Sequence, residues 1–105
     1  MVDGMLIING KEYFIKYDIN VLCEMKLGGL DVMQLDGELD FIQLRALFYY
    51  GLKKIQHNVV KTQEDAGDLL STYLETGGKI DVLAEVLTNA ITKSLGLDLG
   101  KQVTK

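Results

Sequence analysis

The sequence has one cysteine, one histidine, no proline and no tryptophan. A single cysteine, Cys23, excludes an internal disulfide and gives no sign of an oxidising compartment. One cysteine and one histidine, His57, cannot complete a structural zinc site within a single chain. We therefore expect neither a disulfide framework nor a metal site.

Long apolar runs are also missing. The longest apolar region, residues 39–55, is interrupted by charged residues, whereas a membrane-spanning helix needs about 20 mostly apolar residues. The N-terminus lacks a charged segment followed by an apolar stretch, so no signal peptide is expected. These absences predict a soluble domain of cytoplasmic type that does not interact with a membrane.

The chain has little excess of positive charge anywhere. Its formal net charge is −4 and its pI is about 4.8, whereas a nucleic-acid surface usually needs clustered lysine and arginine. One local basic group flanks a predicted loop, and it consists of Lys53, Lys54, His57 and Lys61. Because cations are favoured at a helix C-terminus, we interpret this group as a solvated helix end and expect no nucleic-acid partner.

What the chain does have is the composition of one globular domain. It contains 105 residues, of which 48% are hydrophobic and 25% are charged, and a domain of this size can bury a core without extra cross-links. The patterns described below predict an α+β fold, in which an N-terminal β-hairpin packs on a bundle of about four helices. The hairpin is expected over residues 1–17, the helices over 18–96 and a frayed tail over 97–105.

The hairpin is predicted from Asn9-Gly10, a pair that suits a type I′ turn because both central residues need positive φ. A two-residue loop sets Ile8 opposite Lys11, and the pairing then continues to Val2 opposite Tyr17. One face of this hairpin is apolar and is expected to pack on the core; it carries Val2, Leu6, Ile8, Tyr13, Ile15 and Tyr17. The other face is only partly polar, because it carries Met5, Ile7 and Phe14 beside Glu12 and Lys16.

Helical spacing of apolar residues begins after Asp18, which is available as a cap. The first stripe consists of Ile19, Leu22, Cys23 and Leu27. The central helix is expected over residues 39–55, with Phe41, Leu44, Phe48, Leu52 and Ile55 on one side and Gly51 close to a neighbour. A capping box at residues 62–65 starts the third helix, and the fourth begins near residue 79 or 80. The expected core includes Leu44, Phe48, Leu52, Leu70, Leu83, Leu87 and Ile91.

No group of residues predicts catalysis. Cys23 lies on an apolar stripe and is expected to behave as a small buried hydrophobe rather than a nucleophile. The carboxylates of Glu64 and Asp65 lie at a helix start, where the dipole favours negative charge. The two glycine pairs, Gly28-Gly29 and Gly77-Gly78, lack the strand-loop-helix context of phosphate loops. We therefore expect no enzymatic activity, no catalytic residue and no cofactor.

Aromatic and basic residues on the central helix are more suggestive. Arg45, Tyr49 and Lys53 share one edge, and Tyr50 lies on the next. Tyrosine beside arginine is a frequent composition of protein-binding patches. The alternative is that both rings simply cover the hairpin or a neighbouring helix.

The order of these elements resembles a known family. The segment "INGKEYFIKYDINVLCEMKLGGLDVMQL" resembles the opening of the tail assembly chaperones of long-tailed phages that infect Gram-positive bacteria. The segment "FIQLRALFYYGLKK" is similar to the family's central helix, and "TQEDAGDLLSTYLETGGKIDVLAEVLTNAITKSLG" is similar to its last two helices. Lys26 departs from the pattern, since relatives tend to have an acidic residue there.

The resemblance implies a chaperone that coats the tape measure protein and keeps it soluble until tail tube subunits polymerise around it. It further implies that this chain is the short form, with a longer frameshifted form recruiting tail tube protein. Such a protein acts in the cytoplasm of the bacterial host and is absent from the mature virion. The main alternative is a small adaptor or regulatory domain that binds one partner; a small hydrolase or transferase would need a polar pocket that these residues do not suggest.

The expected partner-binding residues are Met5, Ile7 and Phe14 on the outer hairpin face and Arg45, Tyr49 and Tyr50 on the central helix. Both strands of the predicted hairpin have an outer edge available for pairing. Open edges and a partly apolar face together predict a homo-oligomer.

Overall fold

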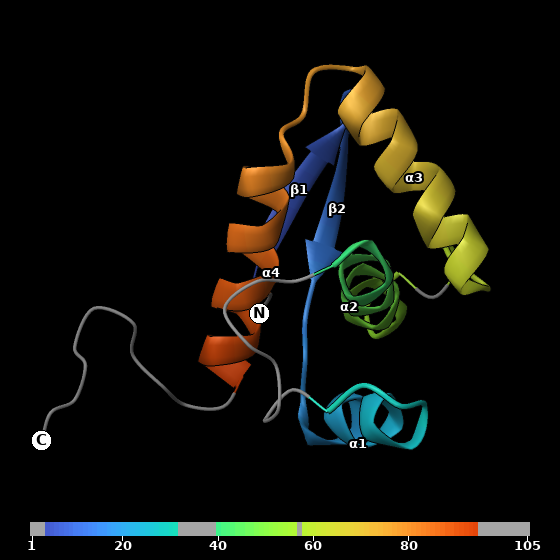
Figure 1. Cartoon of the computed structure of the whole chain (residues 1–105), viewed down its shortest axis with the longest axis vertical. Coiled ribbons are helices and arrows are strands. Elements are labelled where there is room, and N and C mark those ends of the chain that lie inside the picture. The colour runs from blue at the N-terminus through green and yellow to red at the C-terminus, as the bar shows by residue number, and fades with distance from the viewer. Residues whose placement is uncertain (1–3, 32–39, 57, 95–105) are drawn as a thin grey trace, which may run out of the picture.

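The computed structural model describes residues 4–31, 40–56 and 58–94. It has the expected α+β fold, with an N-terminal hairpin followed by four helices (Figure 1). The strands are β1 (Gly4–Ile8) and β2 (Lys11–Ile15). The helices are α1 (Ile19–Leu27), α2 (Phe41–Lys53), α3 (Gln63–Glu75) and α4 (Ile80–Ser94). The expected tail, the basic side chain of His57 and the predicted pairing at Val2 lie outside the described residues.

The hairpin turn has the predicted geometry. Asn9 and Gly10 have φ angles of 51° and 83°, as a type I′ turn requires. The register follows from this turn and places Ile8 opposite Lys11, Leu6 opposite Tyr13 and Gly4 opposite Ile15. The inner face is buried, as predicted, through Leu6, Ile8, Tyr13 and Ile15, with Tyr17 beyond the strand.

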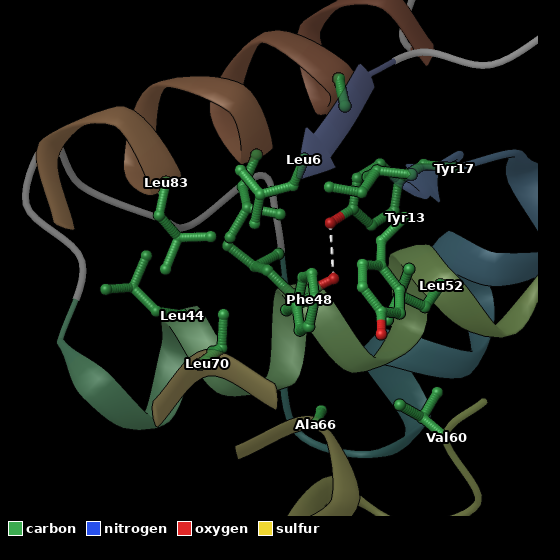
Figure 2. Close-up of a cluster of buried hydrophobic side chains, with 14 of the residues drawn as sticks. Leu6, Tyr13, Tyr17, Leu44, Phe48, Leu52, Val60, Ala66, Leu70 and Leu83 are labelled. Atoms are coloured by element: carbon green, nitrogen blue, oxygen red, sulfur yellow. Dashed lines mark hydrogen bonds between the residues drawn. The ribbon is translucent and has the colours of Figure 1, made fainter. Parts of the chain in front are cut away.

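The helices cover the inner face of the hairpin in a fixed arrangement. Helix α4 packs on β1, α2 packs on β2, and α3 contacts both α2 and β1. Helix α1 lies at the far end of the molecule from the hairpin turn and touches α2 (Figure 1). All of the predicted core residues are buried in one cluster, in which Leu44, Phe48, Leu52, Leu70 and Leu83 can be followed in Figure 2; Leu87 and Ile91 belong to the same cluster.

Local hydrogen bonds explain where the helices start. The Asp18 carboxylate accepts from the Val21 N–H at the start of α1. Thr62 and Asp65 form the predicted capping box of α3. Helix α2 starts with a second capping box, in which Asp40 and Gln43 each accept from the other's backbone N–H. Because capping groups satisfy otherwise unpaired N–H groups, these side chains define the helix starts.

The prediction for the inner side of α1 was wrong for three of its four residues, because only Leu22 packs against the core. Ile19 and Leu27 are 66% and 88% exposed, and Cys23 is exposed as well. The buried residues of this helix are Val21 and Met25. Helix α1 carries apolar residues on two sides, and the side with Val21 and Met25 is the one that is buried in the core. Cys23 is therefore not the buried hydrophobe that the sequence suggested.

The predicted central stripe was also too long. Helix α2 starts at Phe41 and ends at Lys53, and its buried residues begin only at Leu44. Phe41 is 77% exposed and Ile55 is 39% exposed. Both lie at the ends of the periodic pattern, beyond the part of α2 that the hairpin and α3 cover, so their apolar character does not place them in the core.

Candidate partner-binding surface

The outer face of the hairpin is the first candidate surface, and its two apolar residues on β1 are open to solvent. Met5 is 41% exposed and Ile7 is 55% exposed. They project from the same side of β1, since alternate side chains of a strand share a face. Phe14 lies opposite Met5 in the register but is half-buried. The structure therefore brings the three predicted residues together, with Ile7 the most accessible of them.

The outer edge of β2 is closed by the end of α2, which the sequence prediction of two open edges did not foresee. The Phe14 N–H donates to Oε1 of Gln56 at 2.6 Å, and the Lys16 N–H donates to the carbonyl oxygen of Gly51 at 3.0 Å. The prediction was thus wrong for β2. Only tertiary packing brings residues 51 and 56 to this edge, so no local sequence signal could have shown it.

Arg45 lies at the junction of α2 and α3 rather than on a free surface. Its aliphatic chain lies beside Gly67, where an added Cβ would stand 3.1 Å from Arg45 Cδ. Its Nε atom is buried and has no hydrogen-bond partner among the described residues. An unsatisfied buried donor costs about 1–3 kcal/mol, so an incoming acceptor at Arg45 would relieve that cost only if it could reach into the junction.

Tyr49 and Tyr50 contact each other, and Tyr50 also lies against the end of α1. Their ring centroids are 5.0 Å apart in an edge-to-face arrangement, and the Lys53 Nζ lies 5.3 Å from the Tyr49 ring centroid. The Tyr50 hydroxyl packs on Gly28, where an added Cβ would stand 2.6 Å from it. Both rings are half-buried and pack against the core. The Tyr50 ring therefore serves the packing of α1 on α2, whereas the Tyr49 ring packs against the core and against Tyr50.

Sequence reasoning missed a second exposed apolar surface, on α1. Ile19, Cys23 and Leu27 follow each other at intervals of four residues and are all exposed. Residues at this spacing lie on one side of a helix, so we call these three residues the α1 stripe. The signal was present in the sequence, because the same helix also has Val21 and Met25 on another side.

Ion pairs hold the basic residues at the end of α2. Lys54 Nζ lies 2.9 Å from an Asp18 carboxylate oxygen, and Lys53 Nζ lies 3.8 Å from a Glu24 oxygen. The hydrogen bond from the Val21 N–H and the one from Lys54 lower the pKa of Asp18 below its usual range. Both lysines thus neutralise carboxylates of the chain itself, which limits their availability to an anionic ligand.

The hollows of the described surface differ in their lining, and one of them includes Lys61, Asp65 and Asp68. Another hollow of about 450 Å³ lies between the hairpin turn and the connection from α3 to α4. Its lining includes Ile7, Gly10, Tyr73 and Gly77, and it has no carboxylate, histidine or cysteine. Within residues 4–31, 40–56 and 58–94 there is no group of three or more potential metal ligands. No helix in the same residues is long and apolar enough to cross a membrane.

Comparison with protein-family models, curated proteins and solved structures finds no match to this chain. The surfaces of the chain itself therefore indicate what it could bind. Two of them have exposed apolar side chains that share one face of a strand or helix, the outer hairpin face, with Met5 and Ile7, and the α1 stripe; Phe41 and Ile42 at the start of α2 are exposed as well.

Proposed function

We propose that this protein is a phage tail assembly chaperone that binds the tape measure protein and keeps it soluble during tail assembly. The observation that carries the proposal is that apolar side chains stay exposed on regular elements of a well-packed fold. Ile7 lies on a strand whose other face is fully buried, and Leu27 lies on a helix anchored by Met25. Side chains held in this way form preorganised apolar contacts, which lowers the entropic cost of binding.

The ordered resemblance to the chaperone family implies which partner would bind these apolar surfaces. A tape measure protein is long and largely helical, and its apolar seams are exposed before the tail tube surrounds them. Covering those seams removes apolar area from water, which is the main favourable term in association. A chaperone for such a partner needs apolar surfaces rather than a catalytic pocket, and the outer hairpin face and the α1 stripe are of that kind.

We infer the wider setting of this activity from the same family resemblance. The protein acts in the bacterial cytoplasm, several copies coat one tape measure chain, and a longer frameshifted form brings in tail tube protein. An adaptor that binds one partner is the competing function. The two differ in stoichiometry, because a coat needs many copies for each partner molecule and an adaptor needs one or two.

Co-expression with the neighbouring long tail gene tests the proposal. We expect the soluble fraction of the tape measure protein to rise when this protein is present, and the two to co-purify with several copies per tape measure chain. The contact is mainly apolar, so the complex should persist when salt rises from about 0.1 to 0.5 M, which weakens exposed ion pairs.

Surface variants locate the contact. Ile7→Thr alters the outer hairpin face, Ile19→Gln with Leu27→Gln alters the α1 stripe, and Leu74→Gln is the control. Leu74 is 43% exposed on α3, outside both surfaces. We expect at least one of the first two variants to reduce co-purification while the control does not. If the tape measure protein is equally soluble alone and nothing co-purifies, the chaperone function is wrong.

A further inference from the structure

The outer edge of β1 has backbone groups that point away from the hairpin. In an antiparallel pair, residues bonded to each other alternate with residues that are not, and the tight turn makes Ile8 and Lys11 a bonded pair. The N–H and C=O groups of Met5 and Ile7 therefore point outward. The opposite strand has the same alternation, because its Phe14 and Lys16 N–H groups donate outward, to Gln56 just beyond α2 and to Gly51 within it. Among the described residues, none bonds to the outward groups of Met5 or Ile7.

Helix α4 supports β1 without occupying this edge. An added Cβ at Gly4, pointing to the same face as Leu6 and Ile8, would lie 3.2 Å from Val86 Cγ1. The helix therefore meets β1 from the inner face. Since α2 closes the edge of β2, the edge of β1 is where this sheet can accept another strand.

The residues of β1 do not protect this edge from pairing. Natural edge strands usually carry charges, proline or a bulge that discourage association. The segment Gly4–Ile8 has no charged residue and no proline. The charges of the hairpin strands, on Lys11 and Glu12, all lie on β2. An identical strand could therefore approach β1 without like charges meeting.

We propose that two copies of this chain associate through antiparallel pairing of β1 with β1 of the second copy, about a two-fold axis at Leu6. In this register Met5 of one copy lies opposite Ile7 of the other. The N–H and C=O groups of both residues then find partners across the axis, which uses every outward group of those two residues. The two hairpins become one continuous sheet.

The strand that pairs with β1 comes from a second copy of this chain, because β1 is complementary to itself. Antiparallel pairing about Leu6 sets apolar Met5 against apolar Ile7 on the outer face, and no charged side chain meets its counterpart. On the inner side, Val86 and Val82 lie one turn apart on α4, and Val82 is 44% exposed. Val86 is the one of these two residues that the structure places against β1, next to Gly4. The outer apolar face becomes twice as wide, which would also enlarge the surface offered to a tape measure protein.

The mass of the isolated protein as a function of concentration tests the pairing. We expect light scattering to show a rise from 11.7 kDa toward twice that value. Ile7→Pro removes an outward N–H without removing a hydrogen bond of the hairpin, and proline is tolerated at such edge positions. Each dimer then loses two hydrogen bonds of about 1 kcal/mol each, so its dissociation constant should rise at least about 30-fold.

Glu12→Pro is the matched control. Glu12 lies opposite Ile7 in the register, and its N–H points to the other edge of the hairpin. Both variants place the same strain in the same pair of residues, so only the pairing of β1 should distinguish them. Circular dichroism confirms that each variant is folded before its mass is measured.

A disulfide test reports the register and does not depend on the proline variants. In a Cys23→Ser background, Met5→Cys is mixed with Ile7→Cys and oxidised. Directly paired residues have Cα atoms about 5.5 Å apart, which a disulfide can span, whereas diagonal residues of one variant are about 7–8 Å apart. We expect the mixture to cross-link several-fold more than either variant alone.

Three results would overturn the proposal: a mass of 11.7 kDa up to about 1 mM, equal weakening by Ile7→Pro and Glu12→Pro, or equal cross-linking in all samples. These measurements use the isolated chain. Their failure would leave the chaperone function untouched, since that function is judged by the solubility of the tape measure protein.

Discussion

Gly51 in α2 lies so close to Ile15 in β2 that a Cβ atom added to Gly51 would stand 2.8 Å from Ile15 Cγ2. The Tyr17 hydroxyl oxygen would be 2.9 Å from the same atom. The carbonyl oxygen of Gly51 accepts the hydrogen bond from the Lys16 N–H. The missing side chain is thus what allows the helix to approach the strand closely enough to bond to it.

Gly51→Ala should destabilise the protein although alanine is the better helix former. The substitution gains about 1 kcal/mol of helix propensity, but overpacking a core contact costs about 1–3 kcal/mol. We expect a net loss of up to about 2 kcal/mol in the free energy of unfolding, measured by urea denaturation. Gly67→Ala is the contrast, because the flexible chain of Arg45 can move aside; it should be neutral or stabilising. A Gly51→Ala variant more stable than the parent would contradict the close contact.

The start and the middle of the apolar pattern on α2 should respond differently to truncation. Phe48 is fully buried, and Phe48→Ala is expected to cost about 3–5 kcal/mol of unfolding free energy. Phe41 is 77% exposed, so Phe41→Ala should cost less than about 1 kcal/mol. Chemical denaturation of both variants checks the assignment. Comparable losses would mean that Phe41 packs in solution against something that this structure does not show.

The charge of Asp18 should contribute to stability in a pH-dependent way. Its pKa is lowered in the folded state, chiefly by the Val21 N–H and then by Lys54, so its contribution is present above the unfolded pKa. That contribution is lost as the pH falls through the folded pKa. Asp18→Asn keeps an N-cap acceptor but removes the charge; because Asp18 is partly exposed, we expect a loss below about 1 kcal/mol at neutral pH. The difference from the parent should shrink under acid conditions.

A double-mutant cycle isolates the ion pair within that effect. Lys54→Gln is made in the parent and in Asp18→Asn, and unfolding free energies are measured from pH 7 downward. The coupling energy between residues 18 and 54 should be favourable at neutral pH and vanish once Asp18 is protonated. A coupling that stays constant with pH would show that the charge of Asp18 has no part in it.

Cys23 should react as an exposed thiol. A thiol-specific reagent is expected to modify one cysteine per chain in the native protein, at a rate close to that in denaturant. Cys23→Ser should change the unfolding free energy by no more than about 0.5 kcal/mol, as is usual for surface substitutions. Protection of the thiol that disappears on dilution would instead indicate that association covers the α1 stripe.

The sequence predicts this fold well wherever a local rule and a burial pattern agree. Asn9-Gly10 determines the turn, and with it the register, because a shift by one residue would turn Leu6 and Ile8 outward. Leu83 and Leu87 are equally predictable, since α4 has apolar residues mainly on one side and polar residues opposite. In these elements one arrangement satisfies both the backbone and the core.

The sequence fails where an element has two apolar sides or where the answer depends on distant residues. On α1, the side of Ile19 and the side of Val21 are both apolar, and only the surface of α2 decides between them. The candidate site has the same difficulty. Exposure of Ile7 follows from strand alternation, but the hydrogen bond that the Phe14 N–H donates to Gln56 joins residues 42 apart along the chain, so no local pattern predicts it.

The bonds that close the edge of β2 also have a consequence for how the molecule opens. The amide protons of Phe14 and Lys16 point away from the hairpin ladder, so their protection from solvent exchange depends on Gly51 in α2 and on Gln56 just beyond it rather than on β1. Fraying of the two strands would leave both bonds in place, whereas separation of α2 and the residues that follow it would break them together. Hydrogen exchange at these two amides therefore reports the opening of the hairpin from the helices, and equal rates at both would identify β2 and α2 as one cooperative unit.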